Sequence, residues 1–551
     1  MTSSLLLALL LSADKSAGAG QALITASAIT GHVRFLASDA LEGRGPASRG
    51  DELTQQYLAA QYETLGLELL GANGSARQPV ELVGVTGHPE QLTFSRGQAS
   101  FVAKFHHDLI AVSGHQGPVS KLDKADVVFV GYGIVAPEYG WNDYKNVDVK
   151  GKVVLVMNND PEDDAALFAG KTRLWYGRWD YKYQQAAKQG AVGCLIIHTT
   201  PSAGYPWQVV QTSWTGEQFD LPSEKPTPLQ VKGWLTEDAS RKLVALAGKD
   251  LDALRTTAQS REFTPVALGA LASTSFTNVV AKKATANVLG LLRGSDPVLS
   301  DEWLIITAHH DHLGLKEGAK PGEDAVYNGA VDNASGVAAM LTIARALTSQ
   351  PKAPKRSVLF AAVAAEEQGL LGSQYLVEHP PVPWGRMAAN INIDGLNIWG
   401  RTKDVSVIGY GKSSIDATLS QLAKAQGRVV KPDALADRGF FYRSDQFNFA
   451  KVGVPAAYFS SGHAFRDRPE AWGREQREKW ELTHYHQPTD ELLASWDLSG
   501  AVEDVKLIHQ LIVKLADAPA MPTWARGDEF ELARLKALEA LKPNTPRASG
   551  R

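Results

Sequence analysis

The stretch EWLIITAHHDHLG, residues 302–314, begins as an apolar run and ends in a cluster of polar side chains. The run before His309 is bulky and partly β-branched, which is typical of a strand. His309, His310, Asp311 and His312 follow it at once. Open parallel sheets bind ligands outside the carboxyl ends of their strands. The stretch therefore predicts a strand that delivers polar side chains to a binding crevice.

Strands and helices alternate on both sides of this stretch. Residues 335–347 have the apolar spacing of a helix, and four more segments have the pattern of strands: 285–294, 356–367, 387–397 and 453–461. Strands that alternate with helices indicate an α/β fold with a mostly parallel twisted sheet flanked by helices.

Residues 125–272 have a different composition and a different pattern of apolar residues. Short β-branched runs bounded by glycine, asparagine and proline, such as VVFVGYGIV and KVVLVMNND, alternate with aromatic-rich loops. This pattern predicts a β-rich domain inserted into the α/β domain. The tail from residue 516 carries one amphipathic helix.

Composition limits the chemistry. A chain of 551 residues is long enough for two or three domains. With 56 basic and 60 acidic residues the formal charge is −4, so no basic field recruits nucleic acid. The single cysteine, Cys194, excludes an internal disulfide and a thiolate metal cluster. A metal here would be held by His, Asp and Glu, which suits zinc, manganese or cobalt.

The first 22 residues resemble a secretory signal. An apolar run from Leu5 to Leu11 is followed by small residues, although no basic residue precedes the run. The run is too short to span a bilayer. We expect an exported protein, periplasmic or secreted, that has no membrane span.

Polar residues recur at the ends of the predicted elements. Asp332 precedes a helix, Glu366 and Glu367 end one strand, and Asp394 ends another. Singly, each has an ordinary explanation, such as a helix N-cap or a solvated carboxylate pair. Because the carboxyl ends of parallel strands face one crevice, the set together predicts a metal site.

Two histidines also lie near an aspartate in the sequence. His309 precedes Asp311 by two residues, and His486 in THYHQPTDE precedes Asp490 by four. Such a carboxylate can accept the imidazole proton and fix the ring for metal binding. We predict this partnership at both places.

The ordered series AHHDHLG, VDNASG, EEQGLLGS, NIDG and YHQPTD, across residues 275–510, closely resembles the co-catalytic zinc aminopeptidase family, which also includes the glutamate carboxypeptidases. The resemblance implies a zinc exopeptidase-like fold and two zinc ions per chain. It implies these ligands: His309 and Asp394 for one ion, Glu367 and His486 for the other, and Asp332 between them.

The resemblance also assigns the supporting residues. Glu366 becomes the general base, which takes a proton from a water that bridges the metals and returns it to the leaving amine. Asp311 becomes the partner of His309. His310 and His312 are expected to be structural or to support the ligands. The substrates implied are peptides with a free N-terminus.

The inserted segment resembles a protease-associated domain through residues 131–156, GYGIVAPEYGWNDYKNVDVKGKVVLV. The resulting organisation has five parts: a signal peptide at 1–22, the N-terminal part of the peptidase domain at 23–124, the insertion at 125–272, the zinc peptidase domain at 273–515, and a C-terminal helix and tail at 516–551.

Other functions stay open at this point. A carboxypeptidase or dipeptidase would need a cation for the substrate carboxylate, and Arg438 or Arg443 is a candidate for it. A receptor-like relative would bind a partner without catalysis, although such relatives lose ligands that this chain keeps. A glutaminyl cyclase would use a single zinc.

Overall fold

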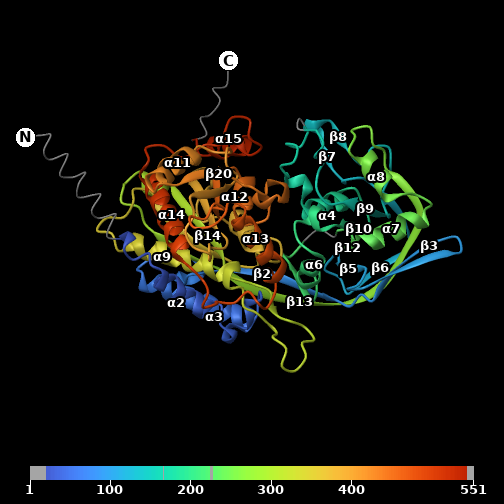
Figure 1. Ribbon diagram of the computed structural model, residues 1–551, viewed down its shortest axis with the longest axis horizontal. Helices are drawn as coiled ribbons and strands as arrows, with labels where there is room; N and C mark the ends of the chain where they lie inside the picture. Colours follow the sequence, from blue (N-terminus) through green and yellow to red (C-terminus); the bar gives the residue numbers. More distant parts are fainter. Residues whose placement is uncertain (1–19, 165–166, 224–226, 543–551) are drawn as a thin grey trace, which may run out of the picture. The chain divides into compact units, whose positions relative to one another are not determined.

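The computed structural model describes residues 20–164, 167–223 and 227–542 (Figure 1). The chain divides into two compact units. The first comprises Met1–Val80, Ala284–Ala434 and Arg443–Arg551, and the second comprises Glu81–Lys283 and Leu435–Tyr442. Nearly all of the predicted signal peptide, residues 1–19, lies outside the described residues.

The first unit is built on one sheet whose central strands are parallel. Strand β14 pairs in parallel with β17 on one side and with β18 on the other, and β18 pairs in parallel with β21. Towards the edges, β13 is antiparallel to β17, β19 is antiparallel to β21, and β20 is parallel to β19. The bounds are β13 Val266–Leu292, β14 Trp303–His309, β17 Ser357–Val363, β18 Met387–Ile393, β19 Asp404–Ile408, β20 Val429–Pro432 and β21 Ala456–Ser461.

Helices pack on both faces of this sheet because its strands are apolar on both sides. Leu304 and Ile306 of β14 belong to one buried cluster, which also holds residues of α2, α9, α11 and α14. Ile305, which points the other way, belongs to a second cluster with residues of α10 and α12. The predicted α/β fold is confirmed. The bounds are α2 Ala26–Leu36, α9 Gly336–Thr348, α10 Leu371–Glu378, α11 Ile415–Ala425, α12 Gln446–Lys451 and α14 Ser499–Asp517.

The described part of the first unit holds three more helices. Helix α3, Arg49–Thr64, buries Asp51 and Thr54 as well as Leu58 and Tyr62 on its inner face. Helix α13, Trp472–Thr483, precedes the THYHQPTDE motif, and α15, Glu531–Glu539, is the helix expected in the C-terminal tail.

The second unit has its own sheet and its own core. Its strands lie in the order β5, β12, β10, β9, β6, β13, β3, β4, with β12, β10, β9 and β6 mutually parallel. Helices are present as well, so the unit is not purely β. The bounds are β3 Gln91–Arg96, β4 Ala99–Lys104, β5 Leu109–Ser113, β6 Val119–Phe129, β9 Val153–Met157, β10 Gly193–His198, β12 Val231–Thr236, α4 Trp179–Lys188, α7 Glu237–Leu246 and α8 Leu251–Ala258.

The border of this unit differs from the one expected at residue 125. The unit begins at Glu81, because β3, β4 and β5 pair into the same sheet and Leu92 and Phe94 share a buried cluster with Phe129. The change of sequence pattern near residue 125, from which the border was predicted, falls inside β6. Strand β3 alternates polar and apolar residues, and the bulky apolar residues of β4 are only Phe101 and Val102, so neither strand shows the long apolar run that marks the later ones.

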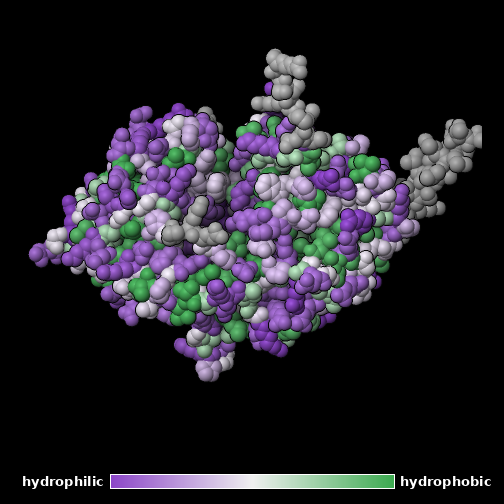
Figure 2. Space-filling view, turned by 180° about the vertical axis from the view of Figure 1, so that it is seen from behind, coloured by the Kyte–Doolittle hydropathy of each residue, from purple (hydrophilic) through white to green (hydrophobic). Residues whose placement is uncertain are grey.

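Within the described ranges, every helix is too short or too polar to cross a bilayer. On the face drawn in Figure 2, hydrophobic residues are scattered among hydrophilic ones.

Candidate metal centre

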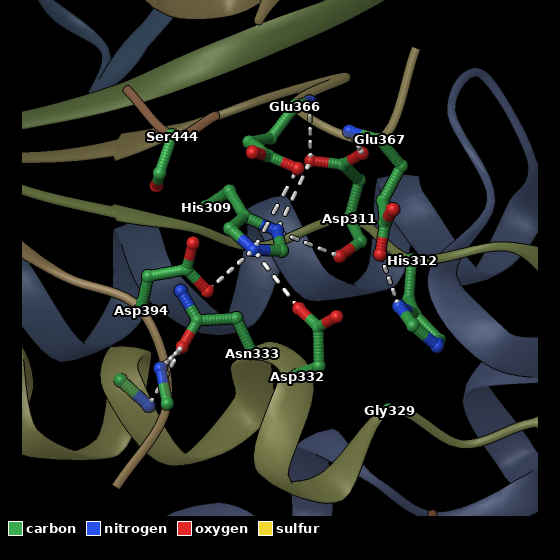
Figure 3. A network of polar contacts seen from close by, with 12 residues as sticks. His309, Asp311, His312, Gly329, Asp332, Asn333, Glu366, Glu367, Asp394 and Ser444 are labelled. Carbon is green, nitrogen blue, oxygen red and sulfur yellow. Dashed lines mark hydrogen bonds and ion pairs between the residues drawn. The ribbon is translucent and has the colours of Figure 1, made fainter. Parts of the chain in front are cut away.

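The carboxyl edge of the first unit's sheet gathers most of the predicted site residues (Figure 3). Strand β14 ends at His309, and β18 ends at Ile393, so that Asp394 follows it directly. Strand β17 ends at Val363, three residues before Glu366. The two glutamates therefore lie in the loop after the strand rather than on it.

The first predicted ligand set converges on one ring nitrogen. The Nε2 atom of His309 lies 3.1 Å from Oδ1 of Asp332 and 3.2 Å from Oδ1 of Asp394. An oxygen of Glu366 is more distant, at 3.9 Å. His309 is 1% exposed, so its ring has no alternative partner in bulk water.

The second predicted set converges in the same way. The Nε2 atom of His486 lies 3.0 Å from Oε2 of Glu367 and 3.4 Å from Oδ2 of Asp332. Asp332 thus presents Oδ1 to one histidine and Oδ2 to the other. The carboxylate of Asp332 therefore links the two ligand sets.

A third histidine was not assigned to the metals by the sequence. The Nδ1 atom of His312 lies 2.6 Å from Oε1 of Glu367. The potential ligand atoms form two donor sets, and within each set they lie within 4.8 Å of one another. One set is His309, Glu366 and Asp394. The other is His312, Asp332 and Glu367. His312 therefore either orients Glu367 or shares in binding.

The buried carboxylates of the centre favour the binding of cations. Burial raises the pKa of Glu366 well above its usual range, and Asp394 and Glu367 add to this. Burial alone would lower the pKa of His309, yet Glu366 and Asp394 raise it well above the ordinary value. Buried carboxylates that crowd two histidines in this way are relieved by divalent ions. The donor set of imidazoles and carboxylates fits zinc.

Asp311 supports the centre by a different route from the predicted one. The Nδ1 atom of His309 donates to the backbone carbonyl of Asp311 at 3.2 Å, while the nearest carboxylate oxygen is 3.8 Å away. The carboxylate of Asp311 instead accepts from the backbone N–H groups of Glu366 at 3.0 Å and Glu367 at 3.3 Å. The residue fixes the tautomer of His309 through its backbone and holds the glutamate pair through its side chain.

Asp490 also binds backbone rather than the imidazole that the spacing predicted. Its carboxylate accepts from the N–H groups of Val331, at 3.0 and 3.2 Å, and Asp332, at 3.0 Å. It therefore holds the turn that carries the bridging carboxylate.

Asn333 joins the Asp332 turn to the Asp394 turn. Its side-chain oxygen accepts from Gly336 at 3.0 Å and Gly395 at 2.9 Å, and its Nδ2 donates to the carbonyl of Ile393 at 3.0 Å. These contacts fix the distance between the turns that carry Asp332 and Asp394, two of the predicted ligands (Figure 3). The peptide bond between Asp332 and Asn333 is cis.

Sequence reasoning missed two buried charges in this unit. Asp445 is fully buried, and burial raises its pKa to about 7. Arg44 is 1% exposed and lies far from the metal motifs in the sequence. Of the two arginines considered for a substrate carboxylate, Arg443 belongs to the first unit, where its Nη2 donates to Tyr485 Oη at 3.4 Å, and Arg438 belongs to the second.

The part of the chain that carries the metal centre matches a known protein family. Residues 287–508 match the model of peptidase family M28, and this range contains all five predicted metal ligands and Glu366. Residues 287–508 are a peptidase family M28 domain. The resemblance to the zinc aminopeptidase family is confirmed for this domain.

Relatives of the M28 domain extend the comparison. Aminopeptidase YwaD of Bacillus subtilis is 24% identical over 366 residues, which are 65% of this chain and 62% of that protein. Aminopeptidase NAALADL1 of Mus musculus is 33% identical over 131 residues, 23% of this chain and 16% of that protein. The chain thus spans less than two thirds of these relatives.

A solved structure supports the fold. The aminopeptidase from Aneurinibacillus sp. strain AM-1 superposes with a TM-score of 0.54 at 18% identity, over 91% of this chain and 96% of that one. That likeness includes chain outside the M28 domain. The match of residues 131–156 to a protease-associated domain stays a prediction.

Proposed function

We propose that this chain is a zinc-dependent aminopeptidase that releases N-terminal residues from peptides. The observation that carries the proposal is the position of Asp332, whose two oxygens face His309 at 3.1 Å and His486 at 3.4 Å. The M28 domain and the aminopeptidase relatives support the same class of activity.

In this proposal two zinc ions are held by His309, Asp332, Glu367, Asp394 and His486. Bound there, they would supply Lewis acidity, which polarises a peptide carbonyl and makes a water between them acidic. The remaining chemistry belongs to the protein. A single zinc ion would need only one of the two donor sets.

Glu366 is the residue placed to move the proton. It belongs to the donor set of His309 and Asp394, but its oxygen lies 3.9 Å from His309 Nε2, farther than the two oxygens assigned to binding, so we assign it to proton transfer and not to the metal. A carboxylate at the edge of the centre can accept a proton from a water molecule there. It takes a proton from water as the oxygen attacks the carbonyl, and it gives that proton to the amine nitrogen as the C–N bond breaks.

Charge favours the amino end of a peptide. In this proposal the carboxylates of Asp311, Asp332, Glu366, Glu367, Asp394 and Asp490 carry six negative charges, whereas two divalent ions and Arg44 carry five positive charges, so one negative charge is left. A free amine is attracted to such a site and a carboxylate is repelled.

One observation favours a second candidate, a carboxypeptidase or dipeptidase. Arg443 donates to Tyr485, and the Tyr485 ring lies 4.0 Å, centroid to centroid, from the ring of His486. An arginine near the metal ligands is a suitable partner for a substrate carboxylate.

Hydrolysis of matched substrates distinguishes the two. We expect zinc-loaded protein to cleave aminoacyl-p-nitroanilides and unblocked peptides, and to leave their N-acetylated forms almost intact. Release of C-terminal residues from N-blocked peptides at a greater rate, abolished in Arg443→Gln, would establish the second candidate instead.

A further inference from the structure

One buried arginine reaches across the sequence to the metal centre. Arg44 lies at the end of the short helical turn Asp39–Arg44 and is 1% exposed. All of its side-chain hydrogen bonds go to backbone carbonyls. Nε donates to His310 at 3.0 Å, Nη2 to Gly329 at 3.0 Å, and Nη1 to Asn328 at 2.6 Å and also to Leu36.

Three of these carbonyls belong to the two loops that carry predicted ligands. His310 follows the ligand His309, and Gly329 lies three residues before the bridging Asp332. The backbone of the arginine adds a further link, because the N–H of His312 donates to the carbonyl of Arg44 at 3.3 Å. Arg44 thus binds both loops at once.

The turn has no room to shift against these loops. A Cβ atom on Gly43 would lie 2.2 Å from the carbonyl oxygen of Gly314 and 2.7 Å from that of Tyr327. Gly43 also has a φ of +66°, a conformation that side chains disfavour. Gly314 ends the His309 loop and Tyr327 begins the Asp332 loop, so the turn is packed directly on both.

The guanidinium is well suited to this task. Its planar fork offers five N–H donors and it carries no acceptor, so it can bind several carbonyls at fixed angles. Burial lowers the pKa of Arg44 to about 10, with Asp311, Asp490 and Asp332 opposing that shift, and the group stays charged at neutral pH. A lysine would keep the charge but not the fork.

We propose that Arg44 is a positioning residue for the metal centre, which sets the separation of the His309 and Asp332 loops and thereby the affinity for the bound ions. The inference rests on the proposed zinc site and adds to it a residue from outside the M28 domain. Arg44 touches neither the ions nor the substrate in this scheme. It acts through the backbone of the loops that hold the ligands.

The test separates positioning from plain stability. Arg44→Met removes the fork and the charge, and Arg44→Lys removes the fork alone. The matched control is Arg356→Met. Arg356 is also 1% exposed and donates to backbone carbonyls, at 3.2 Å to Leu515 and 3.4 Å to Ala516, but it precedes β17 at the end away from the metal ligands.

Two quantities are measured on each full-length variant: the zinc dissociation constant by chelator competition, and the melting temperature with and without saturating zinc. Loss of groups that orient metal ligands typically weakens binding by about 10–100-fold. We expect a loss in that range for Arg44→Met, with a smaller zinc-dependent rise in melting temperature, and a smaller loss for Arg44→Lys. Arg356→Met should lower the metal-free melting temperature and leave zinc affinity unchanged.

The outcomes are distinct. If Arg44→Met lowers the metal-free melting temperature as Arg356→Met does, while its zinc affinity equals that of the wild type, Arg44 is only structural and the inference is wrong. Should Arg44→Met not fold, the zinc affinity of Arg44→Lys decides in the same way. If the wild-type protein itself binds no zinc, the proposed function fails, and it fails independently of any variant.

Discussion

Replacing Glu366 by glutamine tests the assigned chemistry with the least structural change. Glutamine keeps the size of the side chain but cannot accept a proton from water. The backbone N–H of Glu366 donates to Asp311 Oδ1 at 3.0 Å, and this bond survives the substitution. The side chain is 10% exposed, so bulk water has little access to replace the lost base.

The expected loss follows from these features. General bases contribute about 10²–10⁴-fold to rate, or about 3–5 kcal/mol of barrier. A base that is 10% exposed and also returns the proton should lie towards the upper part of that range. We expect kcat to fall by at least about 10²-fold, with KM nearly unchanged because Glu366 is not placed to bind the substrate backbone.

Zinc content distinguishes Glu366 from its neighbour. Glu366 lies 3.9 Å from His309 Nε2, whereas Glu367 lies 3.0 Å from His486 Nε2 and 2.6 Å from His312 Nδ1. Glu366→Gln should therefore keep the zinc content of the wild type. The control Glu367→Gln should lose part of its zinc after dialysis, and excess zinc should restore part of its activity.

The assay is turnover of an unblocked aminoacyl-p-nitroanilide, with zinc per chain measured on the same samples. Turnover of Glu366→Gln within about tenfold of the wild type, below the usual general-base range, would refute the role of Glu366. Loss of zinc equal to that of Glu367→Gln would refute it differently, by making Glu366 a ligand.

Three further predictions concern other residues. His312→Gln should weaken zinc binding by about 10–100-fold without removing an ion, because His312 orients Glu367. His486→Gln should instead leave about one ion per chain. Metal analysis after dialysis compares the two variants. Burial lowers the pKa of His509 to about 4, so between pH 6.5 and 4 the unfolded chain binds a proton that the folded chain does not. The free energy of unfolding therefore falls as the pH drops through that window, by up to about 3 kcal/mol from this group. Urea unfolding at pH 7 and at pH 4.5 measures that fall, and it should be smaller for His509→Gln than for the wild type. N-terminal sequencing of exported protein should begin near residue 23, and retention of residues 1–22 in an exported form would contradict the predicted signal.

The site residues at strand ends were predictable because two simple rules act there. The apolar run of β14 stops at His309 and that of β18 stops at Ile393, and parallel strands direct their carboxyl ends to one edge. The position of Glu366 was predicted less well. Its strand ends at Val363, and the chain turns at Ala365, whose φ is +52°, before the glutamates.

The supporting contacts were not predictable from spacing. Asp311 and Asp490 bind backbone N–H groups, and every residue except proline offers such a donor. Arg44 binds carbonyls 266 to 285 residues away in the metal loops, and no periodicity records such a contact. The border at Glu81 was missed because β3 and β4 lack long apolar runs.

The proposed mechanism requires two zinc ions per chain, and a zinc titration measures that number. Metal-free protein is titrated with zinc while bound metal per chain and turnover of an unblocked aminoacyl substrate are recorded together. The two predicted ligand sets, which share Asp332, predict that binding saturates at two ions per chain and that full activity needs both. Saturation at one ion per chain with full activity would contradict the account.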